Sequence, residues 1–496
     1  MSADWGGNKT MAESLREKSV RGVAWSAIER FALLGIQFVI QVVLARLLTP
    51  EDYGIVGILA VFLAVSQTFI DSGFTNALIQ NQQRTEKDFA TAFFFNGAIS
   101  VLCYGILFLC APVIADFYEM PQLVPVTRVI GLSLIFSALS AVHRTLLTID
   151  VDFKTQTKAT LSAVVLSGMV GIVLAYCGFG VWALVVQTLV STGATTLFFW
   201  ILVRWFPRHF FSMASFKPMF SFGSKLLAAS LLHTVYMNLY PLIVGKFFSA
   251  TALGYFSRAQ QFASLPATTG SGILGRVTFP LLATVQDDNE RLSAVYRKYL
   301  RVSTGAIVPV MLGLCALTEP MVVLLIGEKW LPIVPLMQVL CLAWMVDPIV
   351  LVNLNLLNVK GRTDLVFRLE VVKKITAILI LFASLPFGLI GLCWGKVVYS
   401  QIALIMNTHY TGKFLGMSYG EQMKEVLPIY LLSTAMAGIA FLTTLLWNNP
   451  WWQVGCGLFT GAFVYLLGAK WLSLEILDEG MRVLKRLTNA VFSKLF

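Results

Sequence analysis

Apolar blocks of about 20 residues recur along the whole chain, and they restrict it to a membrane protein. Residues 33–44 contain only Gln37 and Gln41 as polar members, and residues 101–115 contain almost none. Only 13% of the residues are charged, against about a quarter in soluble domains. In a bilayer every backbone group must be hydrogen-bonded internally, and these blocks lack the alternation of barrel strands. The expected fold is therefore all-α, with about 14 transmembrane helices.

The blocks form two sets of six helices and a final pair. The sequence predicts a polar cytoplasmic N-terminal tail over 1–18, an N-terminal six-helix lobe over 19–206, a C-terminal six-helix lobe over 217–415, two extra transmembrane helices over 419–474 and a basic amphipathic C-terminal tail over 475–496. In that last tail Leu477, Met481 and Leu484 share one helical face. This pattern is typical of a helix on an anionic membrane surface, and a frayed basic tail is the alternative.

An internal repeat supports this division. Residues 45–54 (ARLLTPEDYG) resemble residues 245–254 (GKFFSATALG) at an offset of 200, and later the offset becomes 210, which pairs Pro125 with Pro335. A repeat with an even number of helices keeps its orientation, so an axis along the membrane normal would relate the two lobes. Transporters place their substrate site between such lobes.

The basic residues indicate the orientation of the chain. With the N-terminus in the cytoplasm, 28 of the 37 lysines and arginines fall in cytoplasmic segments, 3 in outer loops and 6 deeper in the predicted helices. This asymmetry agrees with the positive-inside rule and places both termini in the cytoplasm, as expected for a multi-pass protein of a bacterial inner membrane. The net charge of +11 therefore marks topology and not a nucleic-acid partner.

Missing motifs exclude several kinds of chemistry. The four histidines form no H-E-x-x-H motif, and no G-x-x-x-x-G-K-[ST] loop occurs. The seven cysteines lie mostly in apolar blocks without a C-x-x-C pair, so they are expected to be small buried hydrophobic residues. We therefore expect no metal and no cofactor, and any work must come from a gradient or a downhill process.

Ionisable residues inside the predicted helices are functional candidates, because each costs several kcal/mol in hydrocarbon unless it is paired or hydrated. Arg30 and Asp71 lie at similar depth on neighbouring helices, if each residue rises about 1.5 Å. Asp347 matches Lys373 or Lys374 in the same way. The alternative is that both are buried ion pairs that only fix helix packing.

Polar stripes lie on four helices that the repeat relates, 19–46 with 217–247 and 52–80 with 252–284. The stripes comprise Arg30, Gln37 and Gln41; Gln67 and Asp71; Lys225, His233, Tyr236 and Tyr240; and Arg258, Gln261 and Arg276. Together they predict a hydrated, basic cavity, which suits an anionic substrate because arginine matches phosphate oxygens. Interhelical hydrogen bonding would explain each stripe alone, and snorkelling would explain Arg128 and Lys396.

At this point the chain resembles a known family. Residues 44–54 (LARLLTPEDYG), 71–74 (DSGF) and 253–260 (LGYFSRAQ) are similar to bacterial polysaccharide flippases. These are the Wzx-type exporters of O-antigen and colanic acid, within the multidrug/oligosaccharidyl-lipid/polysaccharide exporter superfamily. The resemblance covers nearly the whole chain. It implies two six-helix lobes around a central cavity, alternating access, and a cargo of oligosaccharide on undecaprenyl diphosphate that moves to the periplasmic leaflet.

The resemblance also implies roles for individual residues. Arg30 and Arg258 are expected to meet the diphosphate or acidic sugars, and Asp71 matches a recurrent acid of the family that is a candidate for ion coupling. Asp347 is a candidate for ion coupling or ion pairing on the basis of its depth in the helix. The other predicted substrate-binding residues are Lys225, Arg276, Gln37, Gln261, His233 and Tyr240. The expected partners are the lipid-linked oligosaccharide, membrane lipids and other polysaccharide assembly proteins, and the chain is expected to be a monomer.

Two other functions compete with this one. A cation-coupled multidrug efflux pump of the same superfamily would share the fold, but a basic cavity disfavours cationic drugs. A membrane polysaccharide polymerase or ligase would need sizeable periplasmic loops with catalytic arginine or histidine, and the outer loops here are short. An enzyme is therefore not expected, and the identity of the sugar is not indicated by the sequence.

Overall fold

The computed structural model describes residues 33–71 and 73–472, and only the backbone of residues 276 and 277. In this part of the chain the regular elements are all helices. Ten are long and apolar enough to cross a membrane, or up to eleven if the bent pair Met213–Met237 and Leu239–Phe247 forms one span. The all-α, multi-pass membrane fold is therefore confirmed, whereas the number of fourteen spans stays a prediction.

The ten or eleven candidate spans of the structure and the fourteen predicted spans differ in number for physical reasons. Of the predicted first helix, 19–46, only the short apolar helix Leu33–Leu47 is described. Helix α11 (Ala250–Ala283) is 34 residues long and continuous, but polar residues interrupt its apolar sequence, so it is not among the candidate spans. The stretch Thr363–Leu415 counts once, although its 53 residues would extend about 80 Å, well beyond a bilayer core of about 30 Å.

That long stretch is a hairpin of two helices. The short 3₁₀ helix η2 (Leu385–Phe387) ends at Gly388, whose φ of 75° favours glycine. The chain turns there, and α16 (Thr363–Ser384) packs along α17 (Gly388–Leu415). Two transmembrane helices of the predicted C-terminal lobe therefore correspond to α16 and α17.

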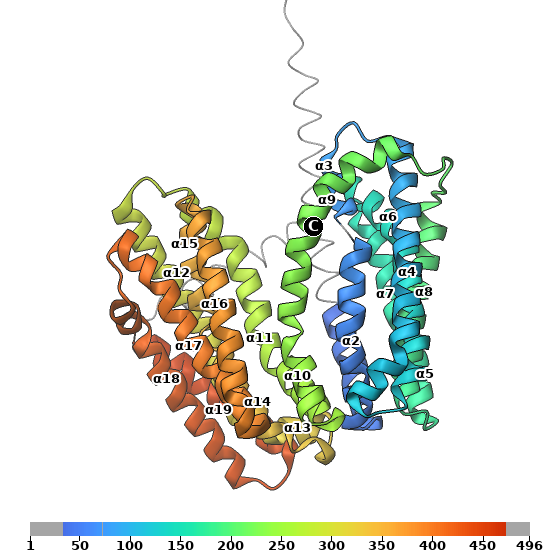
Figure 1. Ribbon diagram of the computed structural model, residues 1–496. Coiled ribbons are helices and arrows are strands. Elements are labelled where there is room, and N and C mark those ends of the chain that lie inside the picture. The colour runs from blue at the N-terminus through green and yellow to red at the C-terminus, as the bar shows by residue number, and fades with distance from the viewer. Residues whose placement is uncertain (1–32, 72, 473–496) are drawn as a thin grey trace, which may run out of the picture. The chain divides into compact units, whose positions relative to one another are not determined.

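The chain divides into two compact units at Gly254. The first unit contains α2 (Pro50–Asp71), α3 (Phe74–Gln80), α4 (Glu86–Tyr118), α5 (Leu123–Ile130), α6 (Leu132–Ile149), α7 (Phe153–Tyr176), α8 (Val181–Val203), α9 (Met213–Met237) and α10 (Leu239–Phe247). Helices α7 and α8 form a hairpin, and α6 packs on both α4 and α8 (Figure 1). Buried Phe74, Phe89 and Met219 join α3, α4 and α9 in one apolar core.

Helices α9 and α10 differ from the expected single span over 217–247. The chain bends by 40° between them, and Asn238 ends α9 and begins α10. The sequence assigns this region to the C-terminal lobe, yet α9 packs against α2, α3 and α4 and belongs to the first compact unit. The predicted six-plus-six division of the lobes itself stays a prediction.

The segment between α8 and α9 is fixed to the first unit by polar contacts. The Trp205 indole N–H donates to Glu86 Oε1 at 2.8 Å, and Nε2 of the buried His143 lies 3.1 Å from the Trp205 carbonyl oxygen. The His143 ring also stacks on Trp200. The start of α4, through Glu86, and α6, through His143, therefore fix Trp205 and the segment that contains it to the first unit.

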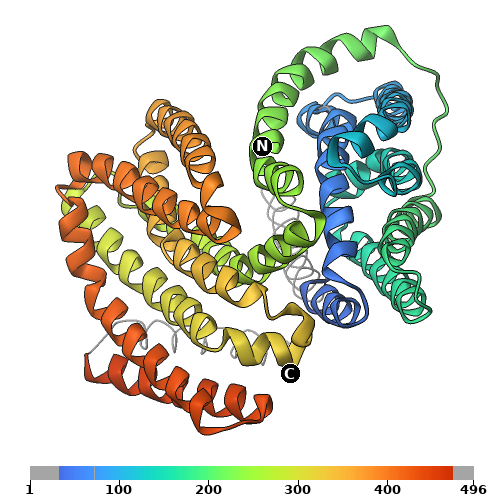
Figure 2. The same cartoon turned by 60° about the horizontal axis from the view of Figure 1, so that its bottom comes forward.

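The second unit begins within α11 and continues with α12 (Asn289–Ala316), α13 (Thr318–Leu325), η1 (Glu328–Trp330), α14 (Ile333–Trp344), α15 (Asp347–Val359), α16, α17, α18 (Tyr419–Leu446) and α19 (Pro450–Trp471). The last two helices pack on each other, and α18 lies along α12 (Figure 2). Large apolar side chains on α19, among them Phe459 and Trp471, are exposed, as expected for a surface that faces lipid. The predicted tails 1–18 and 475–496 lie outside the described residues.

A buried polar network ties four helices of the second unit together. The Tyr296 hydroxyl lies 3.1 Å from Asn353 Oδ1 and 3.0 Å from Gln422 Oε1. Asn353 Nδ2 donates to Gln422 Oε1 at 3.1 Å, and the Thr411 hydroxyl donates to Asn353 Oδ1. All four side chains are fully buried, so the network satisfies polar groups that have no access to water.

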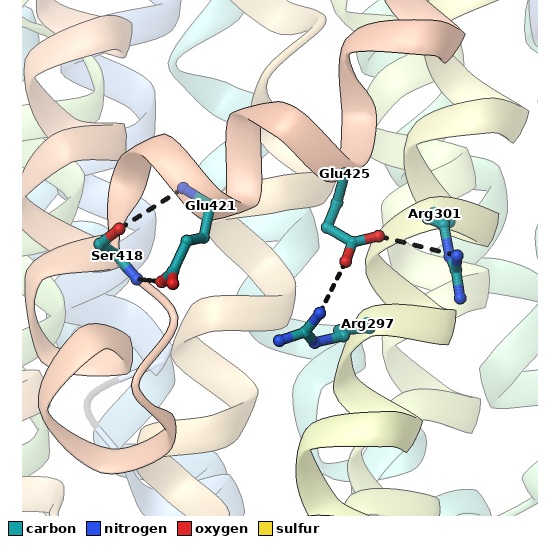
Figure 3. A network of polar contacts seen from close by, with 5 residues as sticks. All are labelled: Arg297, Arg301, Ser418, Glu421 and Glu425. Carbon is teal, nitrogen blue, oxygen red and sulfur yellow. Dashed lines mark hydrogen bonds and ion pairs between the residues drawn. The ribbon is translucent and has the colours of Figure 1, made fainter.

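A charged cluster lies beside this network at the start of α18 (Figure 3). Glu425 accepts a hydrogen bond from Arg297 at 2.9 Å and lies 3.7 Å from Arg301, and both arginines project from α12. Ser418 and Glu421 form a capping box at the N-terminus of α18. The cap and the ion pairs together fix the start of α18 against α12.

The sequence repeat matches the helix boundaries. At the offset of 200, the helix Leu33–Leu47 and helix α10 end at the equivalent residues Leu47 and Phe247. The next helices, α2 and α11, begin at the equivalent residues Pro50 and Ala250. Equivalent hydroxyls also cap the starts: Asp52 N–H donates to Thr49 Oγ1, and Ala252 N–H donates to Ser249 Oγ. The broken helices α5–α6 and α14–α15 begin and end at equivalent positions at the offset of 210.

The two repeated decapeptides 45–54 and 245–254 contact each other reciprocally. An added Cβ on Gly54 would lie 1.7 Å from the Ala250 carbonyl oxygen, and one on Gly254 would lie 1.8 Å from the Pro50 carbonyl oxygen. Gly54 of α2 therefore packs directly on the backbone of Ala250, the first residue of α11. Gly254 of α11 packs in the same way on the backbone of Pro50, the first residue of α2. Only residues without a side chain allow helices to approach this closely.

Candidate functional site

The first unit contains a polar cavity of about 380 Å³ between α2, α3, α6 and α9. Asp71, the last residue of α2, lies in its wall, and Gln67 Nε2 donates to Asp71 Oδ1 at 3.0 Å. Arg144 of α6 lies in the same wall and is the cation that interacts with the Asp71 carboxylate. The cavity therefore contains one acid and one base, each borne by a different helix.

Hydroxyl groups join the helices around this cavity. Thr68 of α2 and Thr234 of α9 share a hydrogen bond of 3.0 Å between their Oγ1 atoms. The Thr145 hydroxyl of α6 donates to Thr75 Oγ1 of α3 at 3.3 Å. Threonine hydroxyls that bond across helices in this way help to hold the walls of the cavity together.

The predicted cation beside Asp71, Arg30, lies outside the described residues, so this pairing stays a prediction. Among the described residues, Arg144 lines the same cavity as Asp71 and attracts its carboxylate electrostatically. From the sequence, Arg144 is expected only as one of the 28 cytoplasmic basic residues. A signal was present, because Ser137 and Arg144 lie seven residues apart on one face of α6, and both line the cavity.

Other predicted residues of the first unit lie outside this wall. Gln37, Lys225 and His233 are exposed, and Tyr240 is half-buried beyond the bend at Asn238. The face that His233, Tyr236 and Tyr240 would share on a continuous helix is therefore interrupted. Within the described residues none of the four lines the cavity, and their role in substrate binding stays a prediction.

The second unit brings two predicted cations to a pair of neighbouring glutamines. Arg258 Nη1 donates to Gln261 Oε1 at 2.6 Å on the same helix, α11. Lys396 Nζ of α17 donates to Gln260 Oε1 at 2.6 Å and lies 5.2 Å from the centre of the Phe256 ring. The snorkelling interpretation of Lys396 is therefore incomplete, because its ammonium reaches a polar group of another helix. The Arg276 side chain is outside the described part of α11.

Asp347 is the acidic residue of the second unit that the sequence predicts as a functional candidate. It begins α15 and lies near the Ser271 hydroxyl of α11 and the Lys373 ammonium of α16. Lys373 also forms an ion pair with Glu370 at 2.5 Å. Lys373 thus lies close enough to attract Asp347 electrostatically, but its ion pair is with Glu370, and the predicted pairing of Asp347 with Lys373 or Lys374 stays a prediction.

The two acids are related through the repeat. At the offset of 200 Asp71 corresponds to Ser271, and at the offset of 210 Ser137 corresponds to Asp347. Asp71 and Ser137 line the cavity of the first unit, while Asp347 lies near Ser271 in the second. In the first unit the acid is on α2 and the serine is on α6. In the second unit the serine is on α11, which is equivalent to α2, and the acid is on α15, so the acid and the serine have exchanged places.

Metal chemistry has no visible support here. Among the described residues no group of three or more histidine, cysteine, aspartate or glutamate side chains could hold a metal ion. All seven cysteines are free, and Cys341 and Cys393 are buried. Cys110 and Cys177 are exposed, contrary to the expectation that the cysteines are small buried hydrophobic residues.

The fold defines the class of protein, a polytopic all-α membrane protein with the architecture of known transporters. The lipid II flippase MurJ, in an inward closed conformation, matches with a TM-score of 0.74 at 15% identity, over 92% of this chain and 100% of that one. An inward-facing multidrug resistance MATE family transporter of the MOP superfamily matches with a TM-score of 0.60 at 15% identity, over 80% and 98%. These likenesses show the fold.

Sequence comparison shows the family. The chain belongs to the polysaccharide biosynthesis protein family, whose model matches residues 43–335. It is 29% identical to the lipopolysaccharide biosynthesis protein WzxC of Escherichia coli (strain K12), over 84% of this chain and 86% of the relative. It is 25% identical to the teichuronic acid biosynthesis protein TuaB of Bacillus subtilis (strain 168), over 87% and 90%.

Proposed function

We propose that this protein is a flippase that moves oligosaccharides linked to undecaprenyl diphosphate from the cytoplasmic to the periplasmic leaflet by alternating access. The observation that carries the proposal is the pair of cations Arg258 and Lys396, which two adjacent glutamines hold on helices α11 and α17 of the second unit. The relatives, named for lipopolysaccharide and teichuronic acid biosynthesis, and the fold shared with a lipid II flippase support it.

The chemistry of the proposed cargo requires such cations. A diphosphate carries at least two negative charges, and each is very costly in hydrocarbon without compensation. Arginine presents a planar fork that matches two phosphate oxygens, and lysine adds a point charge. The glutamine amides hold Arg258 and Lys396 in place by hydrogen bonds without neutralising their charge. The two side chains are thus suited to an anion rather than to a cationic drug.

Export should fall in the order wild type, Arg258→Lys, Arg258→Gln. Lysine keeps the charge but loses the fork, so a severalfold loss is expected; glutamine loses both, so export should fall at least tenfold. Surface polysaccharide and the accumulated lipid-linked precursor are the readouts, at equal protein levels. The matched control is Arg291→Gln, because Arg291 is 79% exposed and pairs only with Asp288 among the described contacts. Full export by Arg258→Gln would contradict the proposed function.

The proposal includes an orientation with both termini in the cytoplasm of the inner membrane, two six-helix lobes, and a monomer that works beside other polysaccharide assembly proteins. In a cysteine-free background, a periplasmic thiol reagent should label Asn448→Cys and not Glu290→Cys. Asn448 is exposed between α18 and α19, and Asn449 is avoided because it caps α19. Labelling of residue 290 but not 448 would reverse the orientation.

A further inference from the structure

We propose that the polar cavity of the first unit is a saccharide-binding subsite, which holds a sugar ring of the cargo through Arg144, Asp71, Asn76 and neighbouring hydroxyls. This inference rests on the proposed function and names the part of the substrate that the cavity recognises. It also gives a role to Arg144, Asn76, Ser137 and Ser230, which the predicted set of site residues did not include.

The groups that line the cavity match the chemistry of a sugar. A saccharide presents hydroxyls that donate and accept hydrogen bonds at close spacing, so its site needs both kinds of partner. Asp71 offers acceptor oxygens, Arg144 offers five N–H donors, and the Asn76 amide offers both. The hydroxyls of Ser137 and Ser230 line the same cavity from α6 and α9.

Several of these groups have hydrogen-bonding capacity left over. Within the described residues, no protein acceptor lies at hydrogen-bonding distance from the Arg144 guanidinium, whose other recorded contact is the Phe199 ring at 5.9 Å. The Asn76 amide and the Ser137 and Ser230 hydroxyls likewise make no side-chain hydrogen bond in this part of the chain. Asp71 uses one oxygen, Oδ1, to bind Gln67. With respect to the described part of the chain, these groups can therefore bind a ligand without breaking a hydrogen bond.

The balance of charge separates this cavity from a phosphate site. Among the described residues that line the cavity, Asp71 and Arg144 are the only ionisable ones, and their opposite charges balance. An incoming diphosphate would meet the Asp71 carboxylate, whereas a neutral polyhydroxylated ring would meet partners of both kinds. The Arg258 and Lys396 pair of the second unit has a different character, because there two cations each donate a hydrogen bond to a neutral glutamine amide.

The size of the cavity also suits a short saccharide. Its volume of about 380 Å³ lies at the lower end of the roughly 300–1,000 Å³ typical of small-molecule sites. Four helices contribute to the wall, and the contacts Thr68–Thr234 and Thr75–Thr145 fix their spacing. A site that is preformed in this way can select a ligand by the positions of its hydroxyls.

Three probes test the assignment with the purified full-length protein in detergent. They are undecaprenyl diphosphate without sugar, the lipid-linked repeat unit extracted from cells that lack this protein, and the oligosaccharide released from that lipid by mild acid. Affinities are measured for the wild type, Asn76→Ala and Arg144→Gln, with Arg144→Lys as the conservative variant. Gln80→Ala is the control, since Gln80 lies one turn beyond Asn76 on α3 and outside the cavity wall. Thermal unfolding checks that each variant is folded.

We expect Asn76→Ala and Arg144→Gln to weaken binding of the lipid-linked repeat unit and of the free oligosaccharide about tenfold, with Arg144→Lys intermediate. Binding of undecaprenyl diphosphate should not change. If Arg144→Gln fails to fold, Asn76→Ala decides, because it removes one exposed neutral amide. An equal loss for the sugar-free lipid, or no loss for either sugar probe, would overturn the subsite. A wild type that binds the oligosaccharide but neither lipid would overturn the proposed function and leave the subsite standing.

Discussion

Export should be lost when Gly54 or Gly254 is replaced by alanine. The new Cβ would lie 1.7 Å from the Ala250 carbonyl oxygen in the first case and 1.8 Å from that of Pro50 in the second, and real Cβ contacts are essentially never below 3.0 Å. Because the opposing atoms belong to the backbone, no side chain can turn aside. The starts of α2 and α11 must separate, and we expect export to fall at least tenfold with a destabilisation of about 1–3 kcal/mol.

The measurement is surface polysaccharide at matched protein levels, together with the thermal unfolding of the purified variants. Gly97→Ala and Gly105→Ala in α4 are the controls, because no atom of the described residues outside the local helix lies within 4 Å of a Cβ built at either position. In those two cases alanine improves helix propensity by about 1 kcal/mol, so export and unfolding temperature should be kept or raised. Wild-type export by Gly54→Ala would mean that the close contact is not needed.

The second large effect is expected from Asn353→Leu, which removes the centre of the buried network in the second unit. Asn353 bonds Tyr296, Thr411 and Gln422, and all of them are fully buried. Leucine would leave the Thr411 hydroxyl without its acceptor and would remove the bonds of Asn353 to Tyr296 and Gln422, which still bond each other. An orphaned buried group costs about 1–3 kcal/mol, and the lost bonds add to that. We expect a total loss of roughly 3 kcal/mol or more, seen as a drop of several degrees in unfolding temperature.

Tyr296→Phe is the matched comparison for this network. It removes one hydroxyl, while Asn353 and Gln422 still bond each other at 3.1 Å, so its destabilisation should be clearly smaller, about 1 kcal/mol. Unfolding of both variants in the same detergent gives the comparison. Equal unfolding temperatures for Asn353→Leu and the wild type would show that water or rearranged side chains replace the lost bonds.

The fold was predictable to a large extent because hydrophobic blocks and their repeat are local properties of the sequence. Residues 45–54 and 245–254 aligned without any knowledge of space, and the helix boundaries follow that alignment. The break at Asn238 was not predictable in the same way. The apolar pattern continues through it, and the packing of α9 on α2, α3 and α4 decides where the chain bends.

The candidate site was predictable in its residue types more than in its partners. Depth along a helix indicated that Asp71 needed a cation, but depth does not say which way a neighbouring helix is rotated. Arg144 lies near the end of α6, where an arginine counts as a cytoplasmic anchor until the rotation of α6 is known. Lys396 was similarly interpreted as a snorkelling residue, and its contact with Gln260 depends on how α17 faces α11.

The reciprocal packing of the decapeptides 45–54 and 245–254 has a consequence for the ancestry of the chain. Pro50 contacts Gly254, which is equivalent to Gly54, and Gly54 contacts Ala250, which is equivalent to Pro50. This exchange of partners is the signature of an isologous interface, as two identical subunits form about a two-fold axis. A half-length ancestor that dimerised in this way would have made the same contact twice. Gene fusion would then have turned an association that depends on concentration into a single polypeptide, after which each half could acquire its own acid.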